Sequence, residues 1–441
     1  MEEARKKTAL RRWAVVGCVF ALIFALAACS PKADDNSTAG SDSGSETAAE
    51  LVAPELREAN TGPNAAGVQT AESWKDAYPK EYETYMANLA NDTSSRGNMI
   101  EMYPQITTIW AGNGFSKSYF EPNGHNYSLD DIRASGRVND KTLANCLTCK
   151  SADFTAMYKA QGDAIFSQTF ADVNATLEEP ISCYNCHEND PTQLVTTQAF
   201  FLTGLGSDAS KVPVESQVCG QCHNEYYFNA DTKAVTNPYT SLAGMTPEAI
   251  YAYYTDKGFK DATNEATGVE WIKVQHPEFE FVYGGTGNTM INTNNPATGE
   301  PFTCASCHMG LQEDAGDGTY YTSHELISPL DNPELLAESC NIGGACHSDL
   351  AAQVEAWQQE SEDKVQADAD KLVELNTKLA EKKDSLDAET LAKVQALYRE
   401  AQFYWEFVMV ENSEGAHNPT LSNACLDLSA AKADEALALL G

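Results

Sequence analysis

Basic residues are scarce in this chain of 441 residues: lysine and arginine together number 29, against 64 aspartates and glutamates, and the formal net charge is −35. A protein this acidic lacks the basic surface that nucleic-acid binding requires, so that class of function is excluded. Hydrophobic residues make up 42% of the chain, which is enough for a packed core and excludes general disorder.

Long apolar runs are lacking except near the N-terminus. Residues 1–28 are typical of an export signal, with a basic start and an apolar run from Trp13 to Ala28 that is short for a membrane span. The segment from Leu26 to Cys29 resembles a bacterial lipobox, which predicts cleavage before Cys29 and a lipid on its thiol; an uncleaved anchor is the alternative. Residues 29–66, rich in small and polar residues, are predicted to be a flexible tether. The remainder is therefore expected outside the cytoplasmic membrane, in the periplasm or at the cell surface.

Long alternating strand patterns are also lacking. From about residue 70 the sequence is aromatic-rich, and short helical patches alternate with turns. Residues 349–410 are instead dominated by Ala, Glu, Lys, Leu and Gln, with apolar residues at helical spacing. We expect a mainly α-helical protein with a body over residues 67–348. Residues 349–441 should complete the same domain with long helices and form a dimer interface.

Thirteen cysteines are present, and ten of them form five pairs. Three pairs are each followed directly by histidine: Cys183, Cys186 and His187; Cys219, Cys222 and His223; Cys304, Cys307 and His308. In this order two thiols can attach to the vinyl groups of a haem while the imidazole ligates its iron. Paired cysteines also bind zinc, but three pairs that each precede a histidine in an exported chain argue against it.

Two further pairs depart from this form. Cys146 and Cys149 are followed by Lys150, whereas Cys340 and Cys346 have five residues between them instead of two and are followed by His347. Each could be a decayed motif. The lysine version is informative because a neutral amine can ligate iron once burial beside a cation has removed its proton.

A C-x-x-C-K haem motif followed by C-x-x-C-H motifs resembles the ammonia-forming pentahaem cytochrome c nitrite reductase family. Residues 219–227 (CGQCHNEYY), 273–277 (KVQHP) and 124–137 match further segments of that family, and the resemblance covers about residues 100–420. It implies a mainly α multihaem cytochrome c with five covalent haem c groups and one calcium ion. It also implies the six-electron reduction of nitrite to ammonium, with four haems as an electron relay.

The resemblance gives the lysine motif the catalytic role. Lys150 would be the proximal ligand of the catalytic haem, and Arg137, Tyr226 and His276 would line its open distal face. Arg133 is the alternative to Arg137, because the stretch from Arg137 to the lysine motif is shorter than usual. Arg137, the calcium ion and a protonated His276 would attract the nitrite anion.

The calcium ligands implied by the resemblance are the Glu225 and Gln275 side chains and the Tyr226 and Lys273 carbonyls. A set made only of oxygen atoms suits this hard cation.

The family pattern uses all eight histidines of the chain. His187, His223, His308 and His347 would be proximal ligands. The resemblance implies that His324 is distal to His187, His125 to His223, and His417 to His308.

No histidine is left for the distal side of the fifth haem. The usual family position is Gly287 here, and we propose Met290, a thioether ligand, in its place. The alternative is a five-coordinate iron or another ligand.

The resemblance also implies partners: a membrane-anchored tetrahaem quinol dehydrogenase as electron donor, and a second copy of the chain. Two other functions stay open from the residues alone. One is reduction of another small species such as sulfite or hydroxylamine, and the other is electron transfer without a substrate site. A pure carrier has no use for the lysine at position 150, which argues against the second.

Overall fold

The computed structural model describes residues 56–92, 96–284, 294, 299, 301–314, 316, 318–332, 336, 347 and 349–441. These residues belong to one compact unit that spans residues 51–441. The predicted leader with Cys29 lies outside the described residues, as do Gly287, Met290, Cys340 and Cys346.

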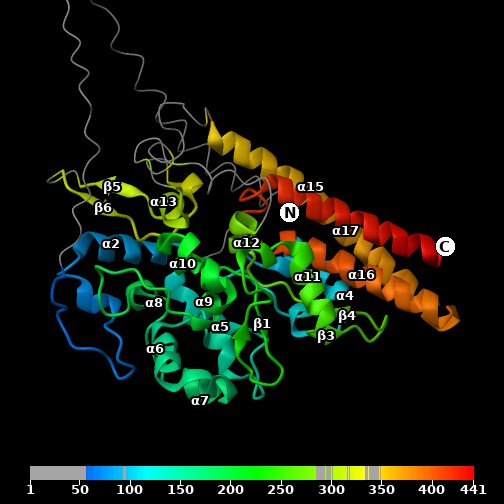
Figure 1. Cartoon of the computed structure of the whole chain (residues 1–441), viewed down its shortest axis with the longest axis horizontal. Coiled ribbons are helices and arrows are strands. Elements are labelled where there is room, and N and C mark those ends of the chain that lie inside the picture. The colour runs from blue at the N-terminus through cyan, green and yellow to red at the C-terminus, as the bar shows by residue number, and fades with distance from the viewer. Residues whose placement is uncertain are drawn as a thin grey trace, which may run out of the picture. The chain divides into compact units, whose positions relative to one another are not determined.

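The described chain is mainly helical, as predicted, and its strands form three short antiparallel hairpins (Figure 1). The α-helices of the body are α2 (Pro79–Ala87), α3 (Met99–Met102), α4 (Ile106–Ile109), α5 (Ser128–Ala134), α6 (Ala152–Gln161), α7 (Phe170–Asn174), α8 (Cys183–His187), α9 (Ala199–Leu205), α10 (Val214–Gly220), α11 (Pro247–Asp256), α12 (Glu278–Tyr283) and α13 (Cys304–His308). The hairpins pair β1 (Tyr227–Phe228) with β2 (Val235–Thr236), β3 (Ala262–Thr263) with β4 (Glu270–Trp271), and β5 (Leu311–Glu313) with β6 (Tyr320–Thr322).

Ten 3-10 turns connect these elements in the described residues: Ala71–Trp74, Asn88–Ala90, Gly114–Ser116, His125–Tyr127, Ala144–Leu147, Gly162–Ser167, Gly206–Lys211, Leu242–Gly244, Pro329–Asp331 and Lys383–Ser385.

Three long helices end the chain: α15 (Leu350–Lys382), α16 (Ala388–Met409) and α17 (Pro419–Leu440). Each begins at a residue whose side chain accepts a backbone N–H of the first turn: Asp349, Asp387 and Asn418. They pack against one another (Figure 1), and α15 also packs on α4 and α16 on α11 and β4. The predicted long helices of residues 349–441 are thus confirmed.

The lone Cys425 lies on the inner side of α17. It is 2% exposed and forms no disulfide. Leu421, Leu426, Ala433 and Ala436 are buried on the same helix. Cys425 is therefore a small apolar core residue, a role that free cysteine commonly takes.

The first described residues are already fixed on the body. Arg57 donates to the Ala77 carbonyl at 2.7 Å, and Asn64 donates to the Asp153 carboxylate at 2.7 Å. Residues 57–66 were predicted to belong to the flexible tether, and that boundary is wrong. Asparagine and arginine side chains find partners on the body that composition could not reveal.

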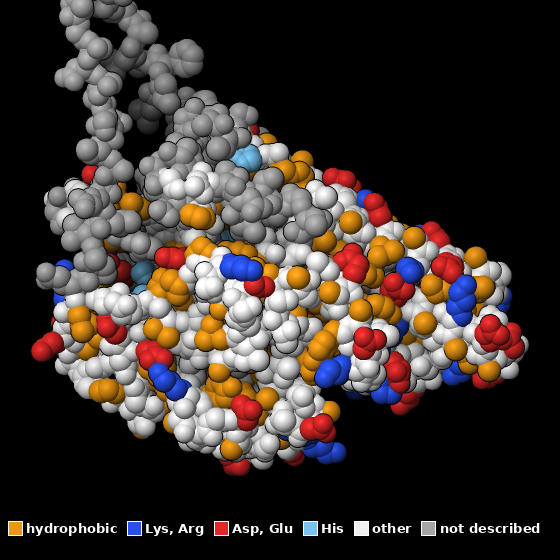
Figure 2. Space-filling model, viewed as in Figure 1, with side chains coloured by type: hydrophobic (Ala, Val, Ile, Leu, Met, Phe, Trp, Pro, Cys, Tyr) orange, Lys and Arg blue, Asp and Glu red, His pale blue; other side chains and the backbone are white. Residues whose placement is uncertain are grey.

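Acidic and basic side chains are interspersed over the long C-terminal helices (Figure 2). Among them, Lys364 pairs with Asp427 and Lys371 with Asp434 at 2.6 and 2.8 Å. The visible face therefore carries no extended basic patch. None of the helices in the described ranges is long and apolar enough to cross a membrane.

A buried ion pair joins α16 to the body. Lys273 Nζ lies 2.8 Å from Glu406 Oε1, and the two side chains are 3% and 0% exposed. Gln402, one turn before Glu406, donates to the Ile272 carbonyl at 3.0 Å. The segment that leads to Gln275 and His276 is thus held by a helix more than a hundred residues further along the chain.

We expect Glu406→Ala to lower the free energy of unfolding by about 3–5 kcal/mol, because it leaves the Lys273 ammonium buried without its partner. Lys364→Ala is the matched control: its pair with Asp427 is 34% and 70% exposed and should contribute less than about 1 kcal/mol. Denaturant unfolding followed by circular dichroism compares the two. Equal losses for both variants would contradict the account.

Candidate haem sites and active site

The C-x-x-C-H motifs form single helical turns. Ser182 caps the N-terminus of helix α8 and Thr303 that of α13, each in a capping box with the third residue of the helix, Asn185 or Ser306. In the third motif His223 N donates to the Cys219 carbonyl at 3.0 Å. Residues three and four apart on a helical turn share one face, so each turn can present two thiols and an imidazole together.

Three pairs of histidines distant in sequence face each other. The ring centres are 6.1 Å apart for His125 and His223, 6.3 Å for His187 and His324, and 6.1 Å for His308 and His417. Two imidazoles on opposite sides of one metal ion, with bonds of about 2 Å each, have centres roughly 6 Å apart. These separations fit the iron of a bis-histidine haem, and the pairs are the ones that the resemblance implies.

The outward nitrogens of these rings are held by backbone carbonyls in three cases. Nδ1 of His187 lies 2.8 Å from the Gln193 carbonyl oxygen. Nδ1 of His308 and Nδ1 of His324 each lie 2.9 Å from a carbonyl oxygen, that of Ile327 and that of Thr322 respectively. A carbonyl requires an N–H at Nδ1, which leaves Nε2 with its lone pair for the iron.

The motif cysteines lie close to one another. The Cys149 thiol contacts that of Cys222, and the Cys219 thiol contacts that of Cys304. The eight motif cysteines in the described residues form no disulfide. Haems attached there would be neighbours, which a relay for electrons requires.

The polar residues expected at the lysine motif gather around it. Arg137 lies close enough to Cys146 and Tyr226 to interact electrostatically with both. Tyr226 in turn lies near both Cys146 and Cys149. His276 is near Lys150, and its Nδ1 is buried without a hydrogen-bond partner in the described part of the chain. A buried unpaired nitrogen is costly unless a ligand satisfies it.

Burial lowers the pKa of His276 to about 3, so the ring is neutral at pH 7. The expectation of a protonated His276 is therefore wrong, and positive charge at the site must come from other groups. His276 also lies 6.3 Å from His223, ring centre to ring centre. Ring separation alone thus fits either His125 or His276 opposite His223, and the resemblance assigns His125.

Arg137 is held by an aromatic pair. Its guanidinium carbon lies 4.4 Å from the ring centre of Phe115 and 5.9 Å from that of Tyr119, and its NH1 donates to the Ser118 carbonyl at 2.9 Å. Burial lowers the pKa of Arg137, but a guanidinium stays charged at neutral pH. The stacking fixes the direction of the charge.

Arg133, the alternative to Arg137, is directed elsewhere. Its guanidinium donates to the Asn174 side chain and the Leu177 carbonyl, both at 2.9 Å. The structure therefore favours Arg137 as the cation of the site.

The resemblance to nitrite reductases predicts that Arg137→Ala raises the KM for nitrite by about tenfold or more, because a charge-assisted hydrogen bond to an anion contributes about 1.5–3 kcal/mol. Arg133→Ala is the matched control and should leave the KM unchanged. Steady-state kinetics with a reduced viologen dye measures both. A larger effect at Arg133 would show that the assignment is reversed.

The proposed calcium ligands are brought together. Glu225 is fully buried; it accepts the Tyr254 hydroxyl at 2.7 Å and the Gln275 backbone N–H at 2.6 Å, and Gln275 Nε2 donates to the Lys273 carbonyl at 3.3 Å. Burial raises the pKa of Glu225 well above its usual range. Beside it, Glu280 Oε2 is buried without a hydrogen-bond partner in the described chain.

Two buried carboxylates with an unpaired oxygen need a nearby positive charge, so these residues fit a hard cation. No group of three or more His, Cys, Asp or Glu side chains in the described ranges could hold a metal.

Comparison with known proteins gives the family. The cytochrome c552 family matches residues 70–441. The chain belongs to this family. It is a c-type cytochrome with covalently bound haem, and the family includes cytochrome c nitrite reductases.

Two relatives illustrate the similarity. Cytochrome c-552 of Parabacteroides distasonis is 30% identical over 375 residues, which cover 79% of this chain and 72% of the relative. The cytochrome c nitrite reductase subunit NrfA of Nitratidesulfovibrio vulgaris is 29% identical over 401 residues, with 79% and 74% covered.

Among solved structures, the cytochrome c nitrite reductase of Desulfovibrio desulfuricans matches this cytochrome with a TM-score of 0.71 and 25% identity, over 84% of this chain and 86% of that chain. Its catalytic subunit is described as having two calcium sites. The predicted family and the predicted multihaem cytochrome fold are confirmed.

Some residues at the site were not predicted from the sequence. Phe115 and Tyr119 lie four apart but belong to a 3-10 turn and the loop after it, so their pairing had no helical signal. Glu406 lies within an apolar helix pattern and is distant in sequence from Lys273, its ion-pair partner, whereas Glu411 contacts residues close to it in sequence, through a loop with no recognisable pattern. Only its placement in a buried stretch of α16, where charge is unusual, could have singled out Glu406.

Proposed function

We propose that this cytochrome reduces nitrite to ammonium at the haem attached to Cys146 and Cys149 and ligated by Lys150. The observation that carries the proposal is the contrast between motifs: three described motifs bring two histidines face to face, whereas the lysine motif is surrounded by Arg137, Tyr226 and His276. An arginine and two hydrogen-bond donors suit a small oxyanion.

Each residue around the lysine motif has a separate role in the proposed reaction. A haem at the lysine motif, when bound, supplies an iron with an open position that takes up the nitrogen and passes on electrons. The Arg137 guanidinium attracts nitrite in an otherwise acidic protein and orients its oxygens. The neutral His276 N–H and the Tyr226 hydroxyl donate to the oxygen that leaves as water. Six electrons and eight protons convert nitrite into one ammonium ion and two waters.

The remaining assignments are part of the proposal. Five haem c groups and one calcium ion would be bound, with His347, Cys340 and Cys346 at the fifth haem and Met290 as its distal ligand. The protein would be exported, anchored by a lipid on Cys29, and dimeric through α15–α17. A membrane-anchored tetrahaem quinol dehydrogenase would supply the electrons.

Haem content tests the irregular motif. We expect pyridine haemochrome analysis to give five haems per chain, because His347 follows the Cys340–Cys346 pair as in the other motifs. Cys346→Ala should lower the count by one, and Cys425→Ala, the matched control with a buried free thiol, should leave it unchanged. Four haems in the native protein would show that this motif is unoccupied.

Spectroscopy separates a reductase from a carrier. The oxidised protein should show a high-spin ferric signal that shifts when nitrite is added. An electron carrier with all irons bound by two side chains would show no such signal. Turnover of nitrite, sulfite and hydroxylamine in competition then shows which substrate the enzyme prefers. A preference for sulfite would overturn the assignment of nitrite.

A further inference from the structure

Glu411 lies just after the C-terminal end of α16 and is completely buried. One of its carboxylate oxygens, Oε1, is 2.6 Å from Nδ1 of His417, the histidine that faces His308. The contact belongs to no group that binds substrate, and it had no signal in the sequence.

Several hydrogen-bond donors converge on the Glu411 carboxylate. Its carboxylate accepts the Ser413 N–H at 3.1 Å, the Ser413 hydroxyl at 2.6 Å and the Gly415 N–H at 3.0 Å, besides His417. The Ser413 oxygen in turn accepts the His417 N–H at 2.7 Å. An imidazole that ligates a metal through Nε2 donates through Nδ1, and the Glu411 carboxylate is placed to accept that hydrogen bond. Nδ1 of His417 therefore carries a proton and Nε2 is left for a metal.

The other ring pairs are held differently. His187, His308 and His324 use neutral backbone carbonyls. Glu278 is 3.6 Å from His223 Nδ1, which is beyond hydrogen-bond distance. His417 and His223 thus both face a carboxylate, and the contact of His417 with Glu411 is the shorter by about 1 Å.

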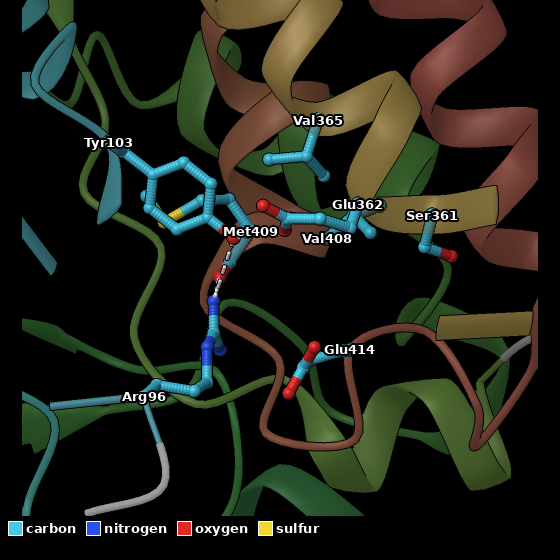
Figure 3. A pocket seen from close by; sticks show the side chains of 8 residues that line it. All are labelled: Arg96, Tyr103, Ser361, Glu362, Val365, Val408, Met409 and Glu414. Atoms are coloured by element: carbon cyan, nitrogen blue, oxygen red, sulfur yellow. Dashed lines mark hydrogen bonds between the residues drawn. The ribbon is translucent and has the colours of Figure 1, made fainter. Parts of the chain in front are cut away.

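The loop that carries Glu411 is fixed from both sides. Arg96 donates to the Met409 carbonyl at 2.5 Å and to the Glu411 carbonyl at 3.3 Å. Arg96, Tyr103, Glu362 and Glu414 line a small cavity behind this loop (Figure 3). On the other side, Asn412 N donates to Glu278 at 3.0 Å.

Gly415 completes the loop. Its φ is +87°, and a Cβ atom there would lie 2.3 Å from the Ser361 oxygen and 2.5 Å from that of Ser422. Glycine is needed both for the backbone angle and for the space. Contacts within the protein alone therefore hold the Glu411 carboxylate in place.

We propose that Glu411 is a positioning residue that fixes the His417 ring for ligation and lowers the reduction potential of the haem bound at Cys304, Cys307 and His308. A carboxylate partner makes an imidazole a stronger donor to its metal, and a buried negative charge stabilises the oxidised iron. This inference rests on covalent haem at that motif and does not depend on nitrite as the substrate.

The test uses the full-length protein with all its haems. Spectropotentiometric titration should show that Glu411→Gln shifts one haem to a higher midpoint potential and leaves the others in place, with a change in one low-spin ferric signal. Glu362→Gln is the matched control, because it removes a buried carboxylate that contacts Tyr103 at 2.5 Å instead of a histidine.

A double variant keeps the test specific. In a His417→Met background, Glu411→Gln should shift the midpoint potential no more than Glu362→Gln does. In the native background, Glu411→Asp retains the carboxylate and should shift the midpoint potential less than Glu411→Gln. Unchanged potentials in Glu411→Gln would overturn the proposal. So would a shift that equals that of the Glu362 variant, because Glu411 would then only stabilise the loop. Loss of nitrite turnover with unchanged potentials would likewise count against it.

Discussion

Replacing Lys150 with leucine should abolish ammonium formation from nitrite while the bis-histidine haems remain reducible by dithionite. Removal of a residue that merely supports a metal ligand costs roughly 10–100-fold, and Lys150 is proposed to be the ligand itself, so the loss should be larger. The structure places Arg137, Tyr226 and the unpaired Nδ1 of His276 near this lysine motif, whereas the three described C-x-x-C-H motifs each bring two histidines face to face.

Lys141→Leu is the control for the Lys150 variant, since Lys141 is exposed and lies before the same motif. It should leave turnover unchanged. The measurement is ammonium formation with a reduced viologen, together with the visible spectrum of the reduced haems. Native turnover in Lys150→Leu would place the chemistry at another haem.

Replacing His276 with alanine should lower kcat for nitrite by about 10²–10⁴-fold, the usual contribution of a positioned proton donor. The ring is neutral, so the variant removes an N–H donor and not a charge. Its effect should therefore appear mainly in kcat, whereas that of Arg137→Ala should appear mainly in KM.

The same variant decides how His276 relates to His223, whose ring is 6.3 Å away. If His276 acts at the lysine motif, the low-spin ferric signals should stay as in the native protein. His125→Ala is the matched control, and it should remove one low-spin signal by opening the haem of His223. Near-normal turnover in His276→Ala, or a lost low-spin signal, would refute the assigned role.

Much of the haem architecture could be predicted because its chemistry is local. A C-x-x-C-H turn contains both thiols and a ligand within five residues, and this local pattern needs no knowledge of the fold. The long helices were predictable for a similar reason, since Asp349 and Asp387 begin apolar patterns at helical spacing.

What could not be predicted depends on contacts between distant segments. Arg96 and Glu411 are 315 positions apart, and the Gln402 side chain reaches a carbonyl 130 positions before it. Neither pair has a local signal. The charge of His276 was mispredicted for the same reason: its ionisation depends on burial, which the sequence does not give.

The central claim is that this cytochrome converts nitrite into ammonium, and product stoichiometry tests it most directly. The purified protein is supplied with nitrite and a limiting amount of reduced viologen, and ammonium, nitrite and oxidised dye are measured together. The account predicts one ammonium for each nitrite consumed and six electrons for each ammonium. Oxidation of the dye without loss of nitrite, or accumulation of nitric oxide or hydroxylamine in place of ammonium, would contradict it.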